Sequence, residues 1–412
     1  MTRAAGVGGA PAQPPSIRES PYAWRRLVAS LAISTVGGVG IWSVVVALPA
    51  VQAEFGAARG GASLPYSATM LGFALGGVAM GRLADRFGIV APVVLGAIAL
   101  CVGYVGAAQA TALWQFVLLQ GLLVGFLGSS TVFGPLVADI SLWFDRRRGM
   151  AVGICASGNY LAGTIWPPLI QAGIEHLGWR TTYAWIGIAC IATMLPLAAM
   201  LRRPPPEQAP GAAGSGEAGA FRVSAGTLQA LLVVAGLTCC LAMAMPQVHI
   251  VAYCGDLGYG VARGAEMLSL MLGFGVASRL ASGWICDRIG GVRTLLLGSA
   301  FQCATLVLYI PFDGLTSLYV VSILFGLSQG GIVPSYAIIV REYMPASEAG
   351  TRVGLVLMAT IIGMAIGGWL SGFIFDATGS YRAAFVAGIG WNLVNLSIAL
   401  WLLANRPAPR AA

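Results

Sequence analysis

Twelve predominantly apolar segments alternate with short polar loops along the chain. Each holds about 20 residues, the length that an α-helix needs to cross roughly 30 Å of membrane hydrocarbon. The segments cover residues 27–50, 66–83, 90–108, 113–138, 149–172, 181–201, 227–251, 265–285, 293–311, 316–340, 352–374 and 382–403. This pattern predicts an all-α integral membrane protein with twelve transmembrane helices.

The loop after the sixth segment differs from the others in composition. It holds three consecutive prolines, Pro204 to Pro206, followed by a run of Gly, Ala and Ser that is typical of a flexible linker. The chain therefore divides into two sets of six helices. We expect a tail over 1–24, a first bundle over 25–201, the linker over 202–226, a second bundle over 227–404 and a tail over 405–412.

The two halves carry the same motif, G-x-x-x-D-R-x-G, after the second and the eighth segments. Its defining residues are Gly81, Asp85, Arg86 and Gly88 in the first copy and Gly283, Asp287, Arg288 and Gly290 in the second. A carboxylate and a guanidinium at the end of a helix can clip neighbouring helices together through charge-assisted hydrogen bonds. A single copy would equally fit a polar cap at the membrane boundary, but the repetition favours a pair of cytoplasmic gate loops.

Composition supports a membrane protein and predicts its orientation. Charged residues make up 9% of the chain and apolar residues 58%, against about 25% charged residues in soluble proteins. This argues against a soluble enzyme, a disordered protein and a nucleic-acid-binding protein. All 23 basic residues are arginine, and with the N-terminus inside, the non-cytoplasmic loops hold only Arg59, Arg180, Arg263 and Arg382. Because positive residues stay in the cytoplasm, we expect both termini and the linker there.

Neither a cofactor nor a metal ion is expected. The eight cysteines lie mostly in apolar runs, without a C-x-x-C pair or a companion histidine, so the sequence predicts no disulfide framework or zinc site. The first 21 residues lack the apolar stretch and cleavage site of a secretory signal, and we interpret them as a cytoplasmic tail. The absence of lysine and the high Ala, Gly and Arg content indicate a GC-rich bacterial genome, so the expected location is the bacterial inner membrane.

One charged side chain lies deep in an apolar segment. Arg279 is about three residues, or roughly 4.5 Å, from the centre of the eighth segment. A charge there costs about 2.5 to 3.5 kcal/mol on insertion scales and usually persists for function. A guanidinium offers a planar fork that fits a carboxylate. We predict that Arg279 binds an anion; the alternative is a side chain that snorkels to the interface or pairs with a carbonyl.

Two titratable residues near the external end of the seventh segment are candidates for proton coupling or for an outer gate. His249 lies in an apolar stretch, and histidine titrates near neutral pH. Asp256 follows seven residues later. The alternatives are a passive hydrogen-bonding histidine and an aspartate in an exposed loop.

The twelve spans, the central linker and the repeated loop resemble the major facilitator superfamily of secondary transporters. The resemblance implies two six-helix bundles that rock about a central site. Three stretches resemble its monocarboxylate and oxalate/formate branch: Trp143 to Met150, Pro246 to Gly258, and Ser278 to Leu280 with Gly283 and Asp287. The branch implies that Arg279 binds the substrate carboxylate.

The chain also departs from that branch. Animal monocarboxylate transporters have a carboxylate one turn before the helix 8 arginine, where this chain has Gly275. Either His249, Asp256 or the substrate itself then carries a proton, or transport is not coupled to protons. Oxalate carriers add a lysine in helix 11, and this chain has none. One buried cation neutralises one carboxylate, so we expect a monoanion.

Polar and aromatic residues near the midplane supply the remaining candidates, because transporter sites lie between the two halves. They are Trp42 in the first segment, Asn159 and Tyr160 in the fifth, and Gln329, Ser335 and Tyr336 in the tenth, with Asn159 and Tyr336 as the first choices. Packing between helices is the alternative for each.

Together these features predict a secondary active transporter, and not an enzyme, that moves a small monocarboxylate such as lactate or pyruvate by alternating access. We expect proton symport by a monomer in the lipid bilayer, without a nucleic-acid partner. The alternative is an organic-anion exchanger, or a drug or metabolite exporter, of the same fold. A receptor would be expected to add a soluble domain, and a membrane enzyme would need a converging set of nucleophile, base or metal ligands; the sequence displays neither.

Overall fold

The computed structural model describes residues 19–144, 147–204, 224–344 and 348–405. Most of the predicted tails, most of the predicted linker and Arg146 lie outside these described residues. Over the described ranges the chain forms helices joined by short turns, without a strand among them. The all-α prediction is confirmed.

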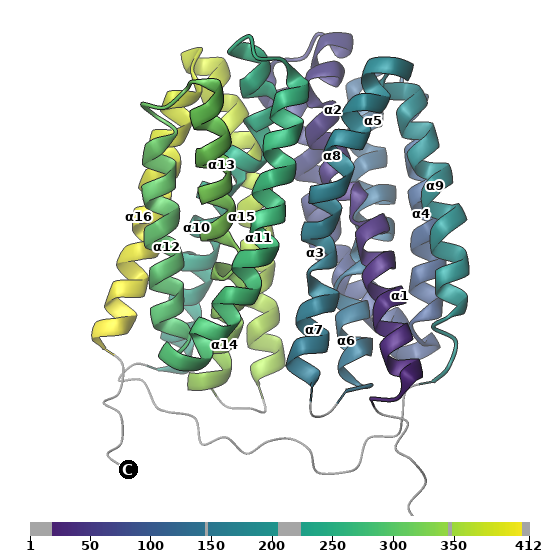
Figure 1. The fold of residues 1–412 in the computed structure, drawn as a ribbon, viewed down its shortest axis with the longest axis vertical. Helices are drawn as coiled ribbons and strands as arrows, with labels where there is room; N and C mark the ends of the chain where they lie inside the picture. The colour runs from purple at the N-terminus through teal and green to yellow at the C-terminus, as the bar shows by residue number, and fades with distance from the viewer. Residues whose placement is uncertain (1–18, 145–146, 205–223, 345–347, 406–412) are drawn as a thin grey trace, which may run out of the picture.

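Two helical bundles stand side by side (Figure 1). The first holds α1 (Pro21–Gly37), α2 (Val39–Phe55), α3 (Arg59–Phe87), α4 (Val90–Ala108), α5 (Leu113–Leu119), η1 (Gln120–Gly128), η2 (Ser129–Val132), α6 (Gly134–Ser141), α7 (Arg148–Ala156), α8 (Gly158–Leu177) and α9 (Trp179–Ala199). The second holds α10 (Ala225–Asp256), α11 (Val261–Ile289), α12 (Gly291–Leu308), α13 (Leu315–Gln329), α14 (Ile332–Tyr343), α15 (Ala349–Thr378) and α16 (Tyr381–Ala404). Helix α1 begins and α16 ends at the lower end in Figure 1, which we call the terminal end; the opposite end is the distal end.

Eleven helical segments in the described part of the chain, some of them made of two or more consecutive helices, are long and apolar enough to cross a membrane. The consecutive α7 and α8 occupy the remaining predicted span. Several helices run past their predicted segments: α3 begins at Arg59 rather than at 66, and α10 ends at Asp256 rather than at 251. The additional turns carry polar side chains, so a search for apolar windows ends before the helix does.

Local signals explain several helix ends. The side chain of Ser20 accepts a hydrogen bond from the Ala23 amide at 3.3 Å and caps α1, with Pro21 in the first turn. Gly88 ends α3 and Gly290 ends α11, with φ of 78° and 82°. Only glycine adopts this backbone conformation at little cost. The final glycine of both motif copies therefore has a structural role.

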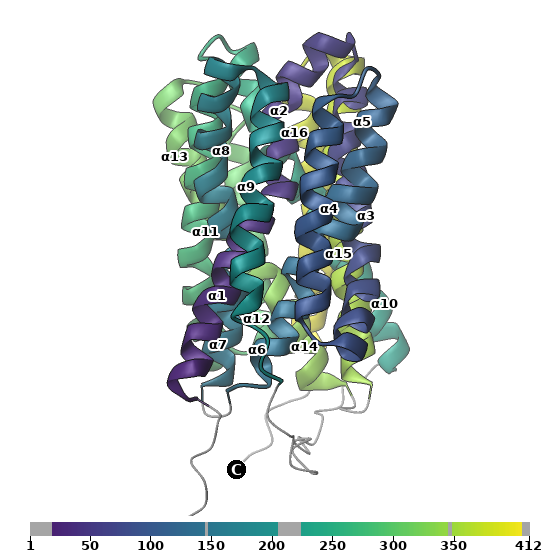
Figure 2. The ribbon, with the colours of Figure 1, turned by 90° about the vertical axis from the view of Figure 1, so that its right-hand side faces the viewer.

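Among the described residues, four of the membrane-spanning segments are interrupted part-way along. Helix α1 gives way to α2 at Gly38, η1 and η2 separate α5 from α6, α7 meets α8 at Ser157, and α13 meets α14 at Gly330 and Gly331. Figure 2 shows α1 below α2 along one rod. Irregular backbone at membrane depth is tolerated where it is buried in protein or lines a cavity, and transporter sites form at such breaks. The breaks therefore point to the region in which to search for a site.

The two bundles are packed together toward the distal end. The Ser67 hydroxyl of α3 donates to the Ala365 carbonyl of α15 at 2.6 Å. Between α8 and α11, the Ser269 hydroxyl donates to the Thr164 carbonyl. Each bond joins the first bundle to the second, so these helix pairs seal the distal half of the interface.

The same helix faces are open toward the terminal end. Further toward the terminal end, each helix or its continuation has a glycine at a helical spacing that places it on the same face. These glycines are Gly81 in α3, Gly153 in α7, Gly283 in α11 and Gly354 in α15. A methyl group added to any of these four would meet no atom within 4 Å. The interface is thus closed at the distal end and open at the terminal end.

Candidate functional site

Arg279 of α11 lies between the two bundles. Its Nη1 donates to the Ala156 carbonyl of the first bundle at 3.2 Å, and its Nε approaches the Gly330 carbonyl of the second at 3.5 Å. The guanidinium carbon lies 4.4 Å from the centre of the Tyr160 ring. No carboxylate in the described part of the chain forms an ion pair with Arg279. Since arginine stays charged, this side chain keeps an uncompensated positive charge that suits a carboxylate.

Of the predicted site residues from the first bundle, Tyr160 contacts Arg279, with Asn159 and Trp42 beside Tyr160. The Trp42 indole donates to the Asn159 carbonyl at 3.1 Å, and Tyr160 is the next residue along the chain. The Tyr160 ring packs on Gly275, where an added methyl group would lie 2.5 Å from a ring carbon. Gly275 therefore provides the space for Tyr160 one turn before Arg279, at the position where the resembling transporters have a carboxylate.

Tyr336, the predicted contact from the tenth span, faces elsewhere. It is fully buried, and its hydroxyl donates to the side-chain oxygen of Asn395 in α16 at 2.8 Å. This bond lies inside the second bundle. Of the three candidates in that span, Gln329 is near Arg279, because it ends α13 at the break that also brings the Gly330 carbonyl to Arg279.

A second cluster joins the bundles at the distal end. The Arg59 guanidinium bonds to the Asp256 carboxylate and to the Tyr381 hydroxyl, both at 3.0 Å. His249 is fully buried, and its Nδ1 lies 3.1 Å from the same Tyr381 hydroxyl. We call Arg59, His249, Asp256, Asp376 and Tyr381 the distal cluster.

Asp376, the remaining member of this cluster, caps a helix of the other bundle. Helix α3 starts without a side-chain cap, because alanine occupies its N-cap position. The Asp376 carboxylate of α15 accepts the backbone N–H groups of Arg59 at 2.8 Å and Gly60 at 2.7 Å. A carboxylate there satisfies orphan N–H groups and complements the helix dipole. Asp376 and Arg59 were not selected from the sequence, since no local pattern reveals a cap supplied from over 300 residues away.

The repeated motif loops are separate at the terminal end. Asp85 and Asp287 are exposed, and within the described residues neither forms an ion pair. Arg86 lies beside the Phe87 ring at 5.2 Å, and Arg288 lies over the Trp284 ring at 3.3 Å. Among the described residues, no ion pair through these loops clips neighbouring helices together in this arrangement, in which the terminal end is open.

Asp139, near the terminal end of the fourth span, has a structural partner. Its carboxylate accepts two hydrogen bonds from Arg26 at 2.8 and 2.7 Å, and the Arg26 guanidinium also donates to the Leu201 carbonyl. Both side chains are buried. This pair lies within the first bundle, so it ties α1 to α6 and not to the second bundle.

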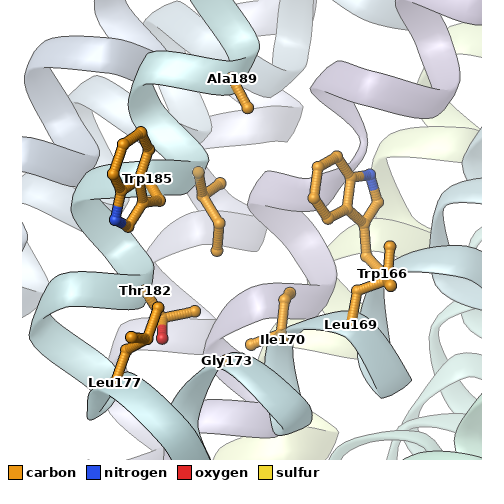
Figure 3. Close-up of a pocket in the computed structure, with 9 residues that line it drawn as sticks. Trp166, Leu169, Ile170, Gly173, Leu177, Thr182, Trp185 and Ala189 are labelled. Carbon is orange, nitrogen blue, oxygen red and sulfur yellow. The ribbon is translucent and has the colours of Figure 1, made fainter.

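An apolar cavity of about 220 Å³ lies between α8 and α9 (Figure 3). The rings of Trp166 and Trp185 flank it, and Leu169 and Leu177 line it nearby. Trp185, Leu169 and Leu177 are each more than half exposed, and none of the lining residues is charged. The cavity thus belongs to the outer surface of the first bundle and offers no group that could hold an anion.

Metal binding has no geometric basis in the described ranges of the chain. No group of three His, Cys, Asp or Glu side chains lies close enough there to hold an ion. The eight cysteines are present as free thiols.

Comparison with known proteins identifies the family. The family model described as Major Facilitator Superfamily matches residues 30–317 and 276–412. The chain belongs to the major facilitator superfamily. As a member, it is a multi-pass membrane transporter rather than an enzyme.

Relatives within the superfamily include monocarboxylate transporters. Monocarboxylate transporter 13 of Bos taurus is 30% identical over 328 residues, which cover 78% of this chain and 75% of that protein. MFS-type transporter pynF of Aspergillus niger is 26% identical over 338 residues, 82% of this chain and 77% of that protein. The chain therefore resembles the monocarboxylate branch, as its sequence motifs indicate.

A solved structure shows the same fold. The bacterial homologue of the human lysosomal transporter Spinster, in an inward-facing and occupied conformation, superposes with a TM-score of 0.75 at 14% identity, covering 95% of this chain and 100% of that one. The fold of this transporter is that of the superfamily.

Proposed function

We propose that this transporter is a secondary active carrier of a small monocarboxylate, of the size of lactate or pyruvate. The observation that carries the proposal is the uncompensated guanidinium of Arg279 between the two bundles. Trp42, Asn159 and Tyr160 form the wall of the same region in the first bundle. The similarity to a bovine monocarboxylate transporter supports the same substrate class.

The charge of the site favours a monoanion. Arg279 supplies one positive charge, and Gln329, next to the Gly330 carbonyl that Arg279 approaches, is neutral. A second carboxylate would enter a low-dielectric region without a partner, which is costly. A dicarboxylate such as oxalate is therefore disfavoured.

Transport would proceed by alternating access between two arrangements of the bundles. The sealed distal end and the open terminal end support one of them. In the other, the terminal end closes, and the loops at Asp85/Arg86 and Asp287/Arg288 clip neighbouring helices. We assign the terminal end to the cytoplasm of a bacterial cell from the arginine distribution, with the carrier working as a monomer in the inner membrane.

The distal cluster is proposed as the external gate. Its bonds join the two bundles and must break before the distal end can open. Opening separates Arg59 from Asp256 and Asp376, and both carboxylates then lack their cationic or N–H partners. Protonation from the external side neutralises them, which supports proton symport through Asp256, with His249 and Tyr381 beside it.

Uptake of labelled lactate into proteoliposomes tests this proposal. We expect an inward proton gradient to drive uptake by the parent protein and Arg279→Ala to abolish it. Arg263→Ala is the matched control, because Arg263 lies on the same helix but pairs with Glu266 at the exposed distal end. Equal uptake by parent and Arg279→Ala would remove Arg279 from the substrate site.

The second candidate is an organic-anion exchanger or an exporter of the same fold. The similarity to the Agnestins efflux protein AgnL12 of Paecilomyces divaricatus, 23% identical over 317 residues, supports an exporter as this candidate. An exchanger would respond to a counter-anion inside the liposomes and not to the proton gradient. The same vesicles, loaded with or without unlabelled lactate, therefore separate the two functions.

A further inference from the structure

A buried amide near Arg279 lacks a hydrogen-bond partner. Gln329 is fully buried at the end of α13. The Gln247 amide of α10 donates to the Gln329 side-chain oxygen. This bond gives the Gln329 oxygen a partner and fixes the orientation of the Gln329 amide. The Gln329 Nε2 has no partner within the described residues. A buried donor without a partner costs free energy, and each such group calls for an explanation.

The unpartnered Nε2 and the Tyr160 ring lie beside the same glycine, Gly275. A methyl group added to Gly275 would lie 3.5 Å from the Gln329 Nε2 and 2.5 Å from a carbon of the Tyr160 ring. The Arg279 guanidinium lies against the same ring, at 4.4 Å from the ring centre. Tyr160 therefore lies next to both groups, and a ligand that takes the place of the ring can reach the guanidinium and the amide together.

These two groups define the chemistry of the ligand. Arg279 is a cationic donor that matches a carboxylate. Gln329 presents N–H donors that lack a partner, while its oxygen already accepts from Gln247. Its complement is an uncharged oxygen next to the carboxylate, as in the oxo or hydroxyl group of a 2-oxo or 2-hydroxy acid.

We infer that Gln329, oriented by Gln247, selects monocarboxylates with an oxygen at carbon 2 over unsubstituted ones. The inference rests on the proposed function and narrows its substrate class. Arg279 binds the carboxylate of every acid in this class, whereas Gln329 binds only the neighbouring oxygen. Gln329 is therefore a specificity residue, and its loss should affect pyruvate and lactate much more than propionate.

The test compares kcat/KM for uptake of labelled pyruvate, lactate and propionate in proteoliposomes. Gln329→Leu removes the amide at similar volume. We expect it to lower the pyruvate-to-propionate ratio of kcat/KM about 10-fold, as loss of one hydrogen bond does. Gln247→Leu leaves Gln329 in place but frees its orientation, and should lower the ratio less.

Gln302→Leu is the matched control. Gln302 is a fully buried glutamine of the second bundle whose oxygen and nitrogen both bond to Cys239. Its replacement should leave the ratio unchanged. If Gln329→Leu does not purify as a monodisperse protein, Gln329→Met supplies the same measurement.

The outcomes separate this inference from the proposed function. A parent that moves none of the three acids refutes both. A parent that moves them, with an unchanged ratio in Gln329→Leu, refutes the role of Gln329 alone. An equal loss for all three acids also refutes it, because the amide would then bind the carboxylate itself. A selective loss for pyruvate and lactate supports it.

Discussion

Replacing Asp256 by asparagine should loosen the distal end of the transporter. The Arg59–Asp256 pair spans the two bundles at 3.0 Å, with the Arg59 side chain 9% exposed and that of Asp256 37% exposed. A hydrogen bond to a charged group contributes about 1.5 to 3 kcal/mol, and the exposure of Asp256 reduces this to about 1 to 2 kcal/mol. At about 1.4 kcal/mol per factor of ten, the distal-open population should rise roughly 5- to 30-fold.

Cysteine labelling measures this change directly. Ser67 is buried in the sealed face of α3, so a Ser67→Cys side chain in an otherwise cysteine-free protein reacts with an impermeant maleimide only when the distal end opens. We expect Asp256→Asn to raise the labelling rate by the factor given above. Added lactate should change the labelling rate of both the parent and the Asp256→Asn variant. This change would show that the protein carrying Ser67→Cys still binds lactate.

The control variant is Asp313→Asn. Asp313 pairs with Arg382 at 3.2 Å at the same end of the molecule, but both residues belong to the second bundle. Breaking this pair should leave the labelling rate unchanged. An equal rise in both variants, or no rise in Asp256→Asn, would refute the reasoning that the distal cluster holds the bundles together.

Three further predictions concern other regions. Gly283→Leu adds a large side chain to a face that is open here and must pack when the terminal end closes, so lactate uptake should stop while the thermal stability of the purified protein is kept; normal uptake would mean that this face never closes. Asp139→Asn leaves the buried Arg26 unpaired and should destabilise the protein by about 3 to 5 kcal/mol, seen as a lower melting temperature in detergent; an unchanged melting temperature would show that the pair is dispensable. Tyr336→Phe removes the bond to Asn395 and should cost about 1 kcal/mol of stability without changing the KM for lactate, whereas a raised KM would return Tyr336 to the substrate site.

The sequence predicts the features that depend on single segments. Apolar windows of sufficient length locate the membrane spans, because the cost of polar groups in hydrocarbon acts on each helix separately. A lone arginine in such a window, Arg279, stands out for the same reason. The final glycines of the repeated motif, Gly88 and Gly290, also follow from local geometry, since both adopt a positive φ.

Features that depend on two distant segments could not be predicted. Asp376 caps α3 across the interface, and an isolated aspartate at the end of the eleventh span has no pattern that identifies its partner. Tyr336 and Gln329 lie in the same span, and only the break at Gly330 and Gly331 decides which of them faces Arg279. Hydropathy does not reveal such breaks, because both sides of each are equally apolar.

The separation of the two charged regions constrains how substrate and protons are coupled. Asp256 ends α10 nine residues, or about 13.5 Å along the helix, after Gln247, whose amide bonds to Gln329 beside Arg279. A proton on Asp256 therefore cannot pass directly to a carboxylate bound at Arg279, and coupling through Asp256 has to involve the motion of the bundles. A guanidinium between the bundles opposes closure around it unless its charge is compensated. A bound monoanion provides this compensation for the loaded carrier. The Tyr160 ring over the guanidinium provides a weaker, cation–π compensation from the protein itself. In the proposed symport, the carrier must change back to its other arrangement without substrate, whereas an exchanger always changes arrangement with an anion bound. The Tyr160–Arg279 contact would stabilise the empty carrier during that step, so it is the feature of this site that favours symport over exchange.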